Sequence, residues 1–284
     1  MNAYSPYPSA PPPFDGFRRA WLSLPPVTAR LIQVNIAVFL LFGLGHLLRN
    51  PVLAGIEAWL ALSLPGLRHG AVWQPLTYMF LHAGFWHIFL NMMTLFCLGP
   101  ETERSMGPRH YLAMYLLSGV AGALGWLWLT PDPRTVCVGA SGAIFGVMAA
   151  FATLYPNRQL TIVFLIPVTT AAWKAVLGLA ALQFFLITGG DSSNIAYAAH
   201  LAGAFAGFLY IDRLYESAFC RRLLNRFWSF LTRRHPPRFT ASASSRTPPD
   251  QAEIDRILDK ISREGIQSLT REERQTLHRA SAKF

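Results

Sequence analysis

The chain has 284 residues, of which 52% are hydrophobic and only 14% are charged, and its formal net charge is +10. Soluble domains carry roughly 25% charged residues, so this composition argues against a soluble domain and favours a protein that spans a membrane. The basic residues flank apolar segments, so we interpret the positive charge as a sign of membrane topology and predict no nucleic-acid partner.

The N-terminal segment is rich in proline, serine and alanine. A biased composition of this kind is typical of a segment without a packed core, so we predict a disordered cytoplasmic stretch over residues 1–27. No cleavable signal peptide is visible at this end of the chain.

Six apolar segments approach the ~20 residues that a helix needs to cross a bilayer. They cover residues 31–48, 78–98, 110–130, 139–155, 169–188 and 195–211. The start of the fifth is the hardest to place, because Pro167 and Lys174 interrupt the apolar run that ends at Ile187. The pattern predicts an all-α, multi-pass membrane protein with a six-helix domain over residues 28–214.

The distribution of basic residues predicts the orientation. With six spans, both termini lie on the same side of the membrane. The opposite side holds only Arg49, Arg68 and Arg134, which leaves 22 of the 25 Lys and Arg residues on the side of the termini. Because short cytoplasmic loops carry an excess of Lys and Arg, we predict an inner-membrane protein with both termini in the cytoplasm.

The long loop between the first two spans, residues 49–77, is not polar. It contains Trp59 and Trp73 within apolar stretches. Amphipathic segments with aromatic residues settle at the membrane surface, so we predict short helices that lie in the interface. The other outer loops, 131–138 and 189–194, are short.

The segment after the sixth span is strongly basic. Residues 213–238 carry seven arginines against the single acidic residue Glu216, with leucines and aromatic residues between them. Anionic cytoplasmic lipid attracts such segments, so we predict a basic amphipathic segment over 215–238 that flanks the membrane.

The C-terminal residues predict a separate small unit. A flexible linker over 239–249 precedes a cytoplasmic helical hairpin over 250–284, in which Thr270 and Glu273 have the spacing of a capping box. A unit of this size buries little core alone, so we expect it to pack on itself, to dimerise or to bind a cytoplasmic partner.

Ser141 and His200 are polar residues inside apolar segments, where such groups are costly and mark functional sites. Ser141 begins the fourth span, where the helix dipole and unpaired N–H groups favour a developing oxyanion. His200 lies ~7 Å from the outer end of the sixth span at 1.5 Å per residue. A Ser–His pair is also the minimum set for activating a hydroxyl nucleophile.

The two polar residues can meet only if the fourth and sixth helices touch. Small-xxx-small pairs allow helix backbones to approach closely. Each helix carries such a pair beside its polar residue, namely Gly142/Gly146 and Gly203/Gly207. The spacing therefore predicts a packed interface next to Ser141 and His200.

The second predicted span contains His82, His87 and Asn91. His87 and Asn91 share one helix face because they are four residues apart. The two histidines lack a carboxylate or thiolate at ligand spacing, so we predict no metal site and no cofactor.

Each of these features also has a purely structural interpretation. A small-xxx-small pair usually serves helix packing alone, and a serine in a membrane helix commonly bonds back to its own backbone. A lone intramembrane histidine can be a structural hydrogen-bonder or a proton relay. The Gly-x-Ser-x-Gly elbow of soluble hydrolases is not met, because Ala143 replaces its last glycine.

Taken in order along the chain, the motifs resemble those of the rhomboid intramembrane serine proteases, and the likeness covers residues 28–214. The motifs are His87-x-x-x-Asn91, Glu103-x-x-x-Gly107, Gly139-x-Ser141-Gly142 and Ala199-His200-x-x-Gly203-x-x-x-Gly207, and Trp73 before Thr77 is similar to the family's first-loop region. Each pattern alone is weak, but their order on the second, fourth and sixth spans is specific.

The resemblance implies a six-helix bundle with a water-accessible cavity that opens outward. It implies Ser141 as the nucleophile and His200 as the general base and then acid. His87, Asn91 and the backbone of Ser141 would line the oxyanion hole. The implied supporting residues are His82, which orders the first loop and local water, Glu103, at a structural position near the cytoplasmic end of the second span, and Gly139, Gly142, Phe145, Gly203 and Gly207.

The sequence departs from the family pattern at two positions. Gln74 stands where some members carry Arg, and Phe145 where some bacterial members have a Tyr packed on the catalytic His. Phe keeps the ring but loses the hydroxyl, so we expect catalysis with altered support of the imidazole. No acidic residue is positioned to complete a triad, so the sequence predicts a Ser–His dyad.

Three functions are compatible with these residues. The leading hypothesis is a serine endopeptidase that cleaves transmembrane segments of other proteins near their outer ends, with those proteins and the lipid bilayer as partners. The second is a catalytically silent rhomboid-like protein that binds membrane clients, against which the intact Ser141 and His200 pair argues. The third, a small transporter, is disfavoured because the spans show no inverted repeat.

Overall fold

The computed structural model describes residues 15–129, 134–163, 167–188, 194–215, 217–231, 251–264, 268–270, 273, 276 and 277. The chain divides into two compact units, residues 1–232 and 233–284. The linker predicted over 239–249 and the first 14 residues lie outside the described residues.

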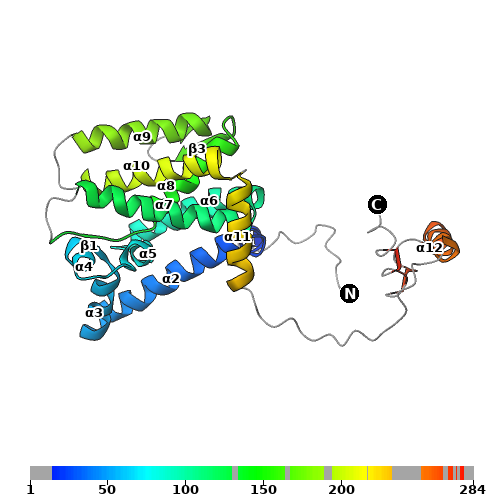
Figure 1. The fold of residues 1–284 in the computed structure, drawn as a ribbon, viewed down its shortest axis with the longest axis horizontal. Helices are drawn as coiled ribbons and strands as arrows, with labels where there is room; N and C mark the ends of the chain where they lie inside the picture. Colours follow the sequence, from blue (N-terminus) through cyan, green and yellow to red (C-terminus); the bar gives the residue numbers. More distant parts are fainter. Residues whose placement is uncertain are drawn as a thin grey trace, which may run out of the picture. The chain divides into compact units, whose positions relative to one another are not determined.

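Six long apolar helices form the first unit and lie side by side in a bundle (Figure 1). They are α2 (Pro26–Leu47), α6 (Phe85–Met106), α7 (Pro108–Leu129), α8 (Ser141–Leu154), α9 (Ala172–Thr188) and α10 (Asn194–Leu209). By length and composition α2 and α7 can each cross a membrane, whereas α8 and α9 are apolar but shorter. This architecture agrees with the all-α, multi-pass fold that the sequence predicts.

The start of the first span differs from the prediction. α2 begins at Pro26 and not at residue 31, and α1 (Asp15–Leu22) is helical within the stretch that was predicted to be disordered. Glu103 of α6 caps the start of α2, because its carboxylate accepts the N–H of Val27 at 3.0 Å and the N–H of Thr28 at 2.7 Å. This cap comes from a residue far along the chain, so the local sequence does not reveal it.

The second predicted span, 78–98, is divided between a 3₁₀ turn, η1 (Tyr78–Phe80), and α6. The helical segment formed by α5 (Gln74–Thr77) and η1 is bent by 95° from α6. Gly84 precedes α6 in an extended conformation with φ of 174°, so the helical path is interrupted there. His82 therefore lies before α6 and not on it, which corrects the predicted placement of this residue.

The start of the fifth span was also predicted wrongly. Residues 169–171 belong to β4 (Pro167–Ala171), which pairs antiparallel with β3 (Gln159–Val163), and α9 begins only at Ala172. Proline lacks the N–H that a helix needs, and the β-branched residues that follow it favour extended backbone. The hairpin precedes α9 for these reasons.

Residues 49–77 form short helices, as predicted: α3 (Pro51–Leu60), α4 (Leu64–Arg68) and α5. A two-residue strand, β1 (Leu62–Ser63), pairs antiparallel with β2 (Val136–Cys137), which leads into α8. Gln74 is 2% exposed, accepts the N–H of Ser63 at 3.0 Å and donates to the carbonyl of Trp59 at 3.2 Å. The side chain of Gln74 thus fastens these segments together at what we call the β1–β2 end of the bundle.

Glycines bring three helices into close contact at the centre of the bundle, where α10 packs chiefly on α7 and α8. A Cβ atom on Gly203 would lie 2.0 Å from the carbonyl oxygen of Gly142, and one on Gly207 would lie 2.2 Å from that of Gly146. Cβ atoms essentially never come within 3.0 Å of another heavy atom. The contact between the fourth and sixth helices that the glycine spacing predicts is therefore present, and it requires glycine on α10.

At the opposite end, α10 continues through a π-helical turn, η2 (Tyr210–Leu214), and α11 (Ala218–Leu231) then runs across the ends of the long helices (Figure 1). We call this the α11 end. Arg109 of α7 donates a hydrogen bond to Asn225, and its guanidinium lies 5.7 Å from the centre of the Trp228 ring. These contacts fasten the predicted basic amphipathic segment to the bundle.

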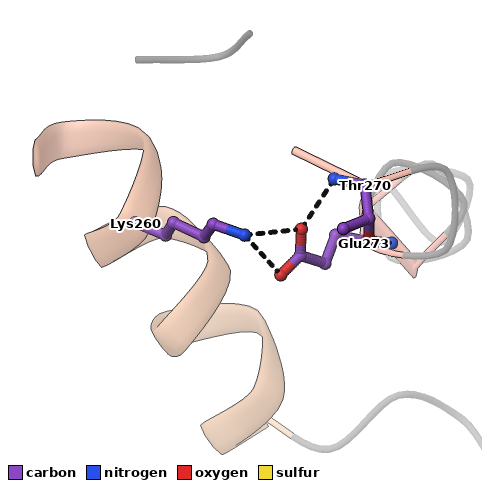
Figure 2. Close-up of polar contacts among 3 residues, drawn as sticks. All are labelled: Lys260, Thr270 and Glu273. Atoms are coloured by element: carbon purple, nitrogen blue, oxygen red, sulfur yellow. Dashed lines mark hydrogen bonds and ion pairs between the residues drawn. The ribbon is translucent and has the colours of Figure 1, made fainter. Parts of the chain in front are cut away.

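The second unit contains α12 (Gln251–Glu264) and a reciprocal capping box (Figure 2). The N–H of Thr270 donates to Glu273 at 2.8 Å, and the N–H of Glu273 donates to the Thr270 hydroxyl at 3.3 Å, as the sequence predicts. Lys260 of α12 donates to both carboxylate oxygens of Glu273 at 3.1 Å. The Thr270 N–H, and after it Lys260, hold the pKa of the Glu273 carboxyl below its usual value.

Candidate active site

Ser141 is the first residue of α8, and the two residues before it turn the chain from β2 into the helix. Gly139 has a φ of +130°, a backbone conformation that residues other than glycine rarely adopt. Its N–H donates to the carbonyl of Tyr78 at 2.9 Å, and the Tyr78 hydroxyl donates to the carbonyl of Gly119 on α7 at 2.7 Å. Tyr78 thus holds the entry to α8 against α7 and fixes the position of Ser141.

His200 of α10 faces Ser141 across the glycine-lined contact. Nε2 of His200 lies 2.8 Å from the Ser141 hydroxyl oxygen, which is a good hydrogen-bond distance. The Phe145 ring, one turn after Ser141 on α8, stacks on the imidazole with a centroid distance of 4.5 Å and an angle of 3° between the planes. Ser141 and His200 are both half-buried, so the pair is packed but accessible.

His87 lies against the backbone that precedes Ser141. A Cβ atom on Gly139 would lie 2.6 Å from Cε1 and 2.7 Å from Nε2 of His87. Position 139 therefore requires glycine for two reasons: its φ value, and the His87 ring, which occupies the space that a Cβ atom would need. The edge of the His87 ring therefore lies against Gly139, two residues before Ser141.

Asn91 and His82 flank His87. Nδ2 of Asn91 donates one N–H to the carbonyl of His87 at 2.8 Å, and its second N–H has no role in that bond. His82 is 7% exposed, and its ring meets the His87 ring edge-on, with centroids 5.1 Å apart. The structure therefore gathers His82, His87 and Asn91 beside the entry to α8.

Glu103 lies away from this cluster. It is buried at the start of α2, where it also accepts the Thr28 hydroxyl at 2.7 Å in addition to the two backbone N–H groups. The sequence resemblance places it at a structural position, and its geometry in the bundle is that of a helix cap.

Sequence reasoning missed one contact of the imidazole. Nδ1 of His200 lies 3.1 Å from Oε1 of Gln183, on α9. An amide within the apolar part of α9 is costly at membrane depth and was the available signal. Among the described residues, no group of three or more His, Cys, Asp or Glu side chains is arranged to hold a metal ion.

The fold and the site together define a class, an α-helical membrane protein in which a Ser–His pair lies between packed helices. A sequence model of the Rhomboid domain matches residues 69–217. Together with the similarity to rhomboid proteins described below, this match shows that the chain belongs to the rhomboid family. A second match, to a family of unknown function (DUF6576), covers residues 245–283, the region of the predicted hairpin.

Several curated proteins are similar to this chain. The putative rhomboid protease YdcA of Bacillus subtilis is 31% identical over 193 residues, 67% of this chain and 89% of that protein. Rhomboid protein 1, mitochondrial, of Saccharomyces cerevisiae is 34% identical over 154 residues, 51% of this chain and 43% of that protein. The rhomboid protease GluP of Bacillus subtilis is 32% identical over 162 residues, 56% of this chain and 30% of that protein.

The chain thus spans most of YdcA but less than half of the yeast protein and of GluP. The Rhomboid-domain match and the apolar helices support a membrane location for this chain.

Proposed function

We propose that this chain is an active serine endopeptidase that cleaves transmembrane segments near their outer ends with Ser141 and His200 as its catalytic dyad. The observation that carries the proposal is the 2.8 Å contact between Nε2 of His200 and the Ser141 hydroxyl. A catalytically silent family member needs no such contact, since binding alone does not require an activated hydroxyl.

The reaction follows from the positions of the two side chains. Nε2 of His200 accepts the Ser141 proton as the hydroxyl oxygen attacks the scissile carbonyl, and the resulting imidazolium donates that proton to the leaving amine. The acyl group then resides on Ser141. A water molecule gives a proton to Nε2 and attacks the ester, and the imidazolium returns the proton to the Ser141 oxygen as the acid leaves.

The oxyanion of each tetrahedral intermediate would be stabilised at the start of α8. The first N–H groups of a helix have no partner within it, and the helix dipole favours negative charge there. The Ser141 N–H, the second N–H of Asn91 and an N–H of His87 would supply the donors. Because Asn91 is already held by its bond to the His87 carbonyl, its free N–H is fixed in direction before the substrate arrives.

The length of α8 supports a site below the membrane surface. Its 14 residues span ~21 Å at 1.5 Å per residue, which is shorter than the ~30 Å hydrocarbon core. If the far end of α8 reaches one boundary of the core, Ser141 lies several ångströms inside the other. A substrate helix must unwind to expose its carbonyls there, which favours small or helix-breaking residues at the cut.

The location and partners are part of the proposal. The excess of basic residues around the α11 end favours an inner-membrane protein with both termini in the cytoplasm and the site toward the outer face. The residues after 250 would then lie in the cytoplasm, where they have no part in the chemistry and are available to a cytoplasmic partner.

Cleavage of a designed transmembrane substrate in liposomes tests the proposal. Purified wild type and the variants Ser141→Ala and His200→Ala are compared, with thermal unfolding to show that the bundle is intact. We expect cleavage by wild type alone. A folded wild-type protein that binds the substrate without cutting it would instead establish the silent client-binding function.

A further inference from the structure

Gln183 makes the second polar contact of the His200 ring. It is the only amide side chain of α9, and the residues next to it in sequence are alanine, leucine and phenylalanine. Its Oε1 lies 3.1 Å from Nδ1 of His200, and the residue is half-buried. The contact thus joins α9 to the imidazole from the side opposite to Ser141.

The chemistry of an amide oxygen favours one protonation pattern of the ring. Oε1 of Gln183 only accepts hydrogen bonds, so its contact with His200 is a hydrogen bond in the tautomer that carries the hydrogen on Nδ1. The neutral imidazole then has its lone pair on Nε2, which faces the Ser141 hydroxyl at 2.8 Å. This tautomer is the one that a general base needs.

Ring stacking alone cannot select this arrangement. The Phe145 ring lies parallel to the imidazole, so it restrains the plane of the ring. A half-turn about the Cβ–Cγ bond keeps that plane but moves Nε2 away from Ser141 and puts Cε1 in its place. The two orientations stack equally well, and they differ in two hydrogen bonds, the one between Nε2 and Ser141 and the one that Gln183 accepts from Nδ1.

We propose that Gln183 is a positioning residue that selects the Nδ1–H tautomer and the ring orientation of His200 through the Nδ1–Oε1 hydrogen bond. The inference rests on the proposed protease function for its kinetic consequence. In a serine-protease triad a carboxylate holds this position and also stabilises the imidazolium. An amide orients the imidazole but carries no charge, so Gln183 supports the Ser–His dyad without stabilising the imidazolium as a carboxylate would.

Three variants separate positioning from packing. Gln183→Met keeps the length of the side chain but accepts no strong hydrogen bond, Gln183→Glu keeps the acceptor and adds a charge, and Leu182→Met is the matched control on the exposed neighbour. Cleavage of the transmembrane substrate is measured as kcat and KM across pH, with unfolding midpoints in the same detergent. The other titratable neighbours of the ring, His87 and Tyr197, are unchanged in all three.

We expect Gln183→Met to lower kcat about tenfold, the value of one hydrogen bond, with little change in KM. Gln183→Glu should recover most of kcat, and the acidic limb of its pH profile should move to higher pH because a carboxylate stabilises the imidazolium. Gln183→Met within twofold of wild type would overturn the proposal. The proposal would also be overturned if Gln183→Glu had the same low kcat as Gln183→Met and an unchanged acidic limb of the pH profile. Such a result is expected if both substitutions act only by disturbing the packing.

A spectroscopic measurement decides the point independently of cleavage. In ¹⁵N-histidine-labelled protein above pH 7.5, the His200 signals are assigned by their loss in His200→Ala. The proposal requires hydrogen on Nδ1 in wild type and a mixture of tautomers in Gln183→Met. Hydrogen on Nε2 in wild type would overturn it, even if the chain proved to be catalytically silent.

Discussion

Replacing Gly203 by alanine should separate Ser141 from His200 while leaving both residues in place. A Cβ atom at this position would lie 2.0 Å from the Gly142 carbonyl oxygen. Carbon and carbonyl oxygen approach to ~3.3 Å in packed helices, so α8 and α10 must move apart by about 1.3 Å. The obstacle is backbone, which cannot rotate out of the way as a flexible side chain would.

The displacement acts directly on the proposed catalytic pair, because Gly142 follows Ser141 and Gly203 lies one turn after His200. A misplacement of ~1 Å at reacting groups can cost on the order of 10² in rate. Overpacking of this kind also destabilises by roughly 1–3 kcal/mol. We therefore expect Gly203→Ala to lose at least tenfold in kcat and to unfold at a lower temperature.

Gly178→Ala on α9 is the matched control, since a Cβ atom there meets nothing within 4 Å. Both variants add one methyl group to an apolar helix, and both are assayed on the same transmembrane substrate with thermal unfolding in detergent. Gly178→Ala should behave as wild type. Wild-type activity and stability in Gly203→Ala would refute the close contact between α8 and α10.

Three further predictions follow from the geometry of other residues. Asn91→Ala should slow single-turnover cleavage by roughly 10²–10³, the cost of one oxyanion-hole donor, without abolishing it; unchanged turnover would remove Asn91 from the site. A chain ending after Phe239 should keep its activity. A chain ending after Leu214 should lose stability, because it lacks α11 and the Tyr215 hydroxyl that donates to the Ser105 carbonyl at 2.8 Å. A Phe239 truncation that is folded but inactive would contradict this prediction. Because the pKa of Glu273 is lowered, its stabilisation of the C-terminal unit should be complete above the pKa of the unfolded chain and lost as pH falls through the folded value; a carboxyl titration of Glu273 by NMR at the usual pKa would refute it.

The parts of the fold that the sequence predicts are those with a local signal. Apolar runs give the long helices, the paired glycines give the contact between α8 and α10, and a polar residue in an apolar run marks Ser141 and His200. Thr270 and Glu273 give the capping box for the same reason, since all of its atoms lie within four residues.

The parts that the sequence does not predict depend on contacts between distant segments. The start of α2 is set by Glu103, 76 residues away from Val27. The η1 turn before the bend is held against α7 by the hydrogen bond from the Tyr78 hydroxyl to Gly119. Gln183 stands out in the sequence as an amide within an apolar run, but its partner His200 on α10 is known only from the fold. The fifth predicted span wrongly includes residues 169–171 at the end of β4, because a short apolar run does not distinguish a strand from a helix.

Covalent labelling of Ser141 tests most directly whether His200 activates it. A fluorophosphonate reacts with an activated serine hydroxyl, and peptide mass spectrometry identifies the modified residue. We predict rapid labelling of wild type at Ser141, no labelling of Ser141→Ala and very slow labelling of His200→Ala, with all three proteins folded. A folded wild-type protein that is not labelled, or a His200→Ala variant labelled at the wild-type rate, would contradict the account.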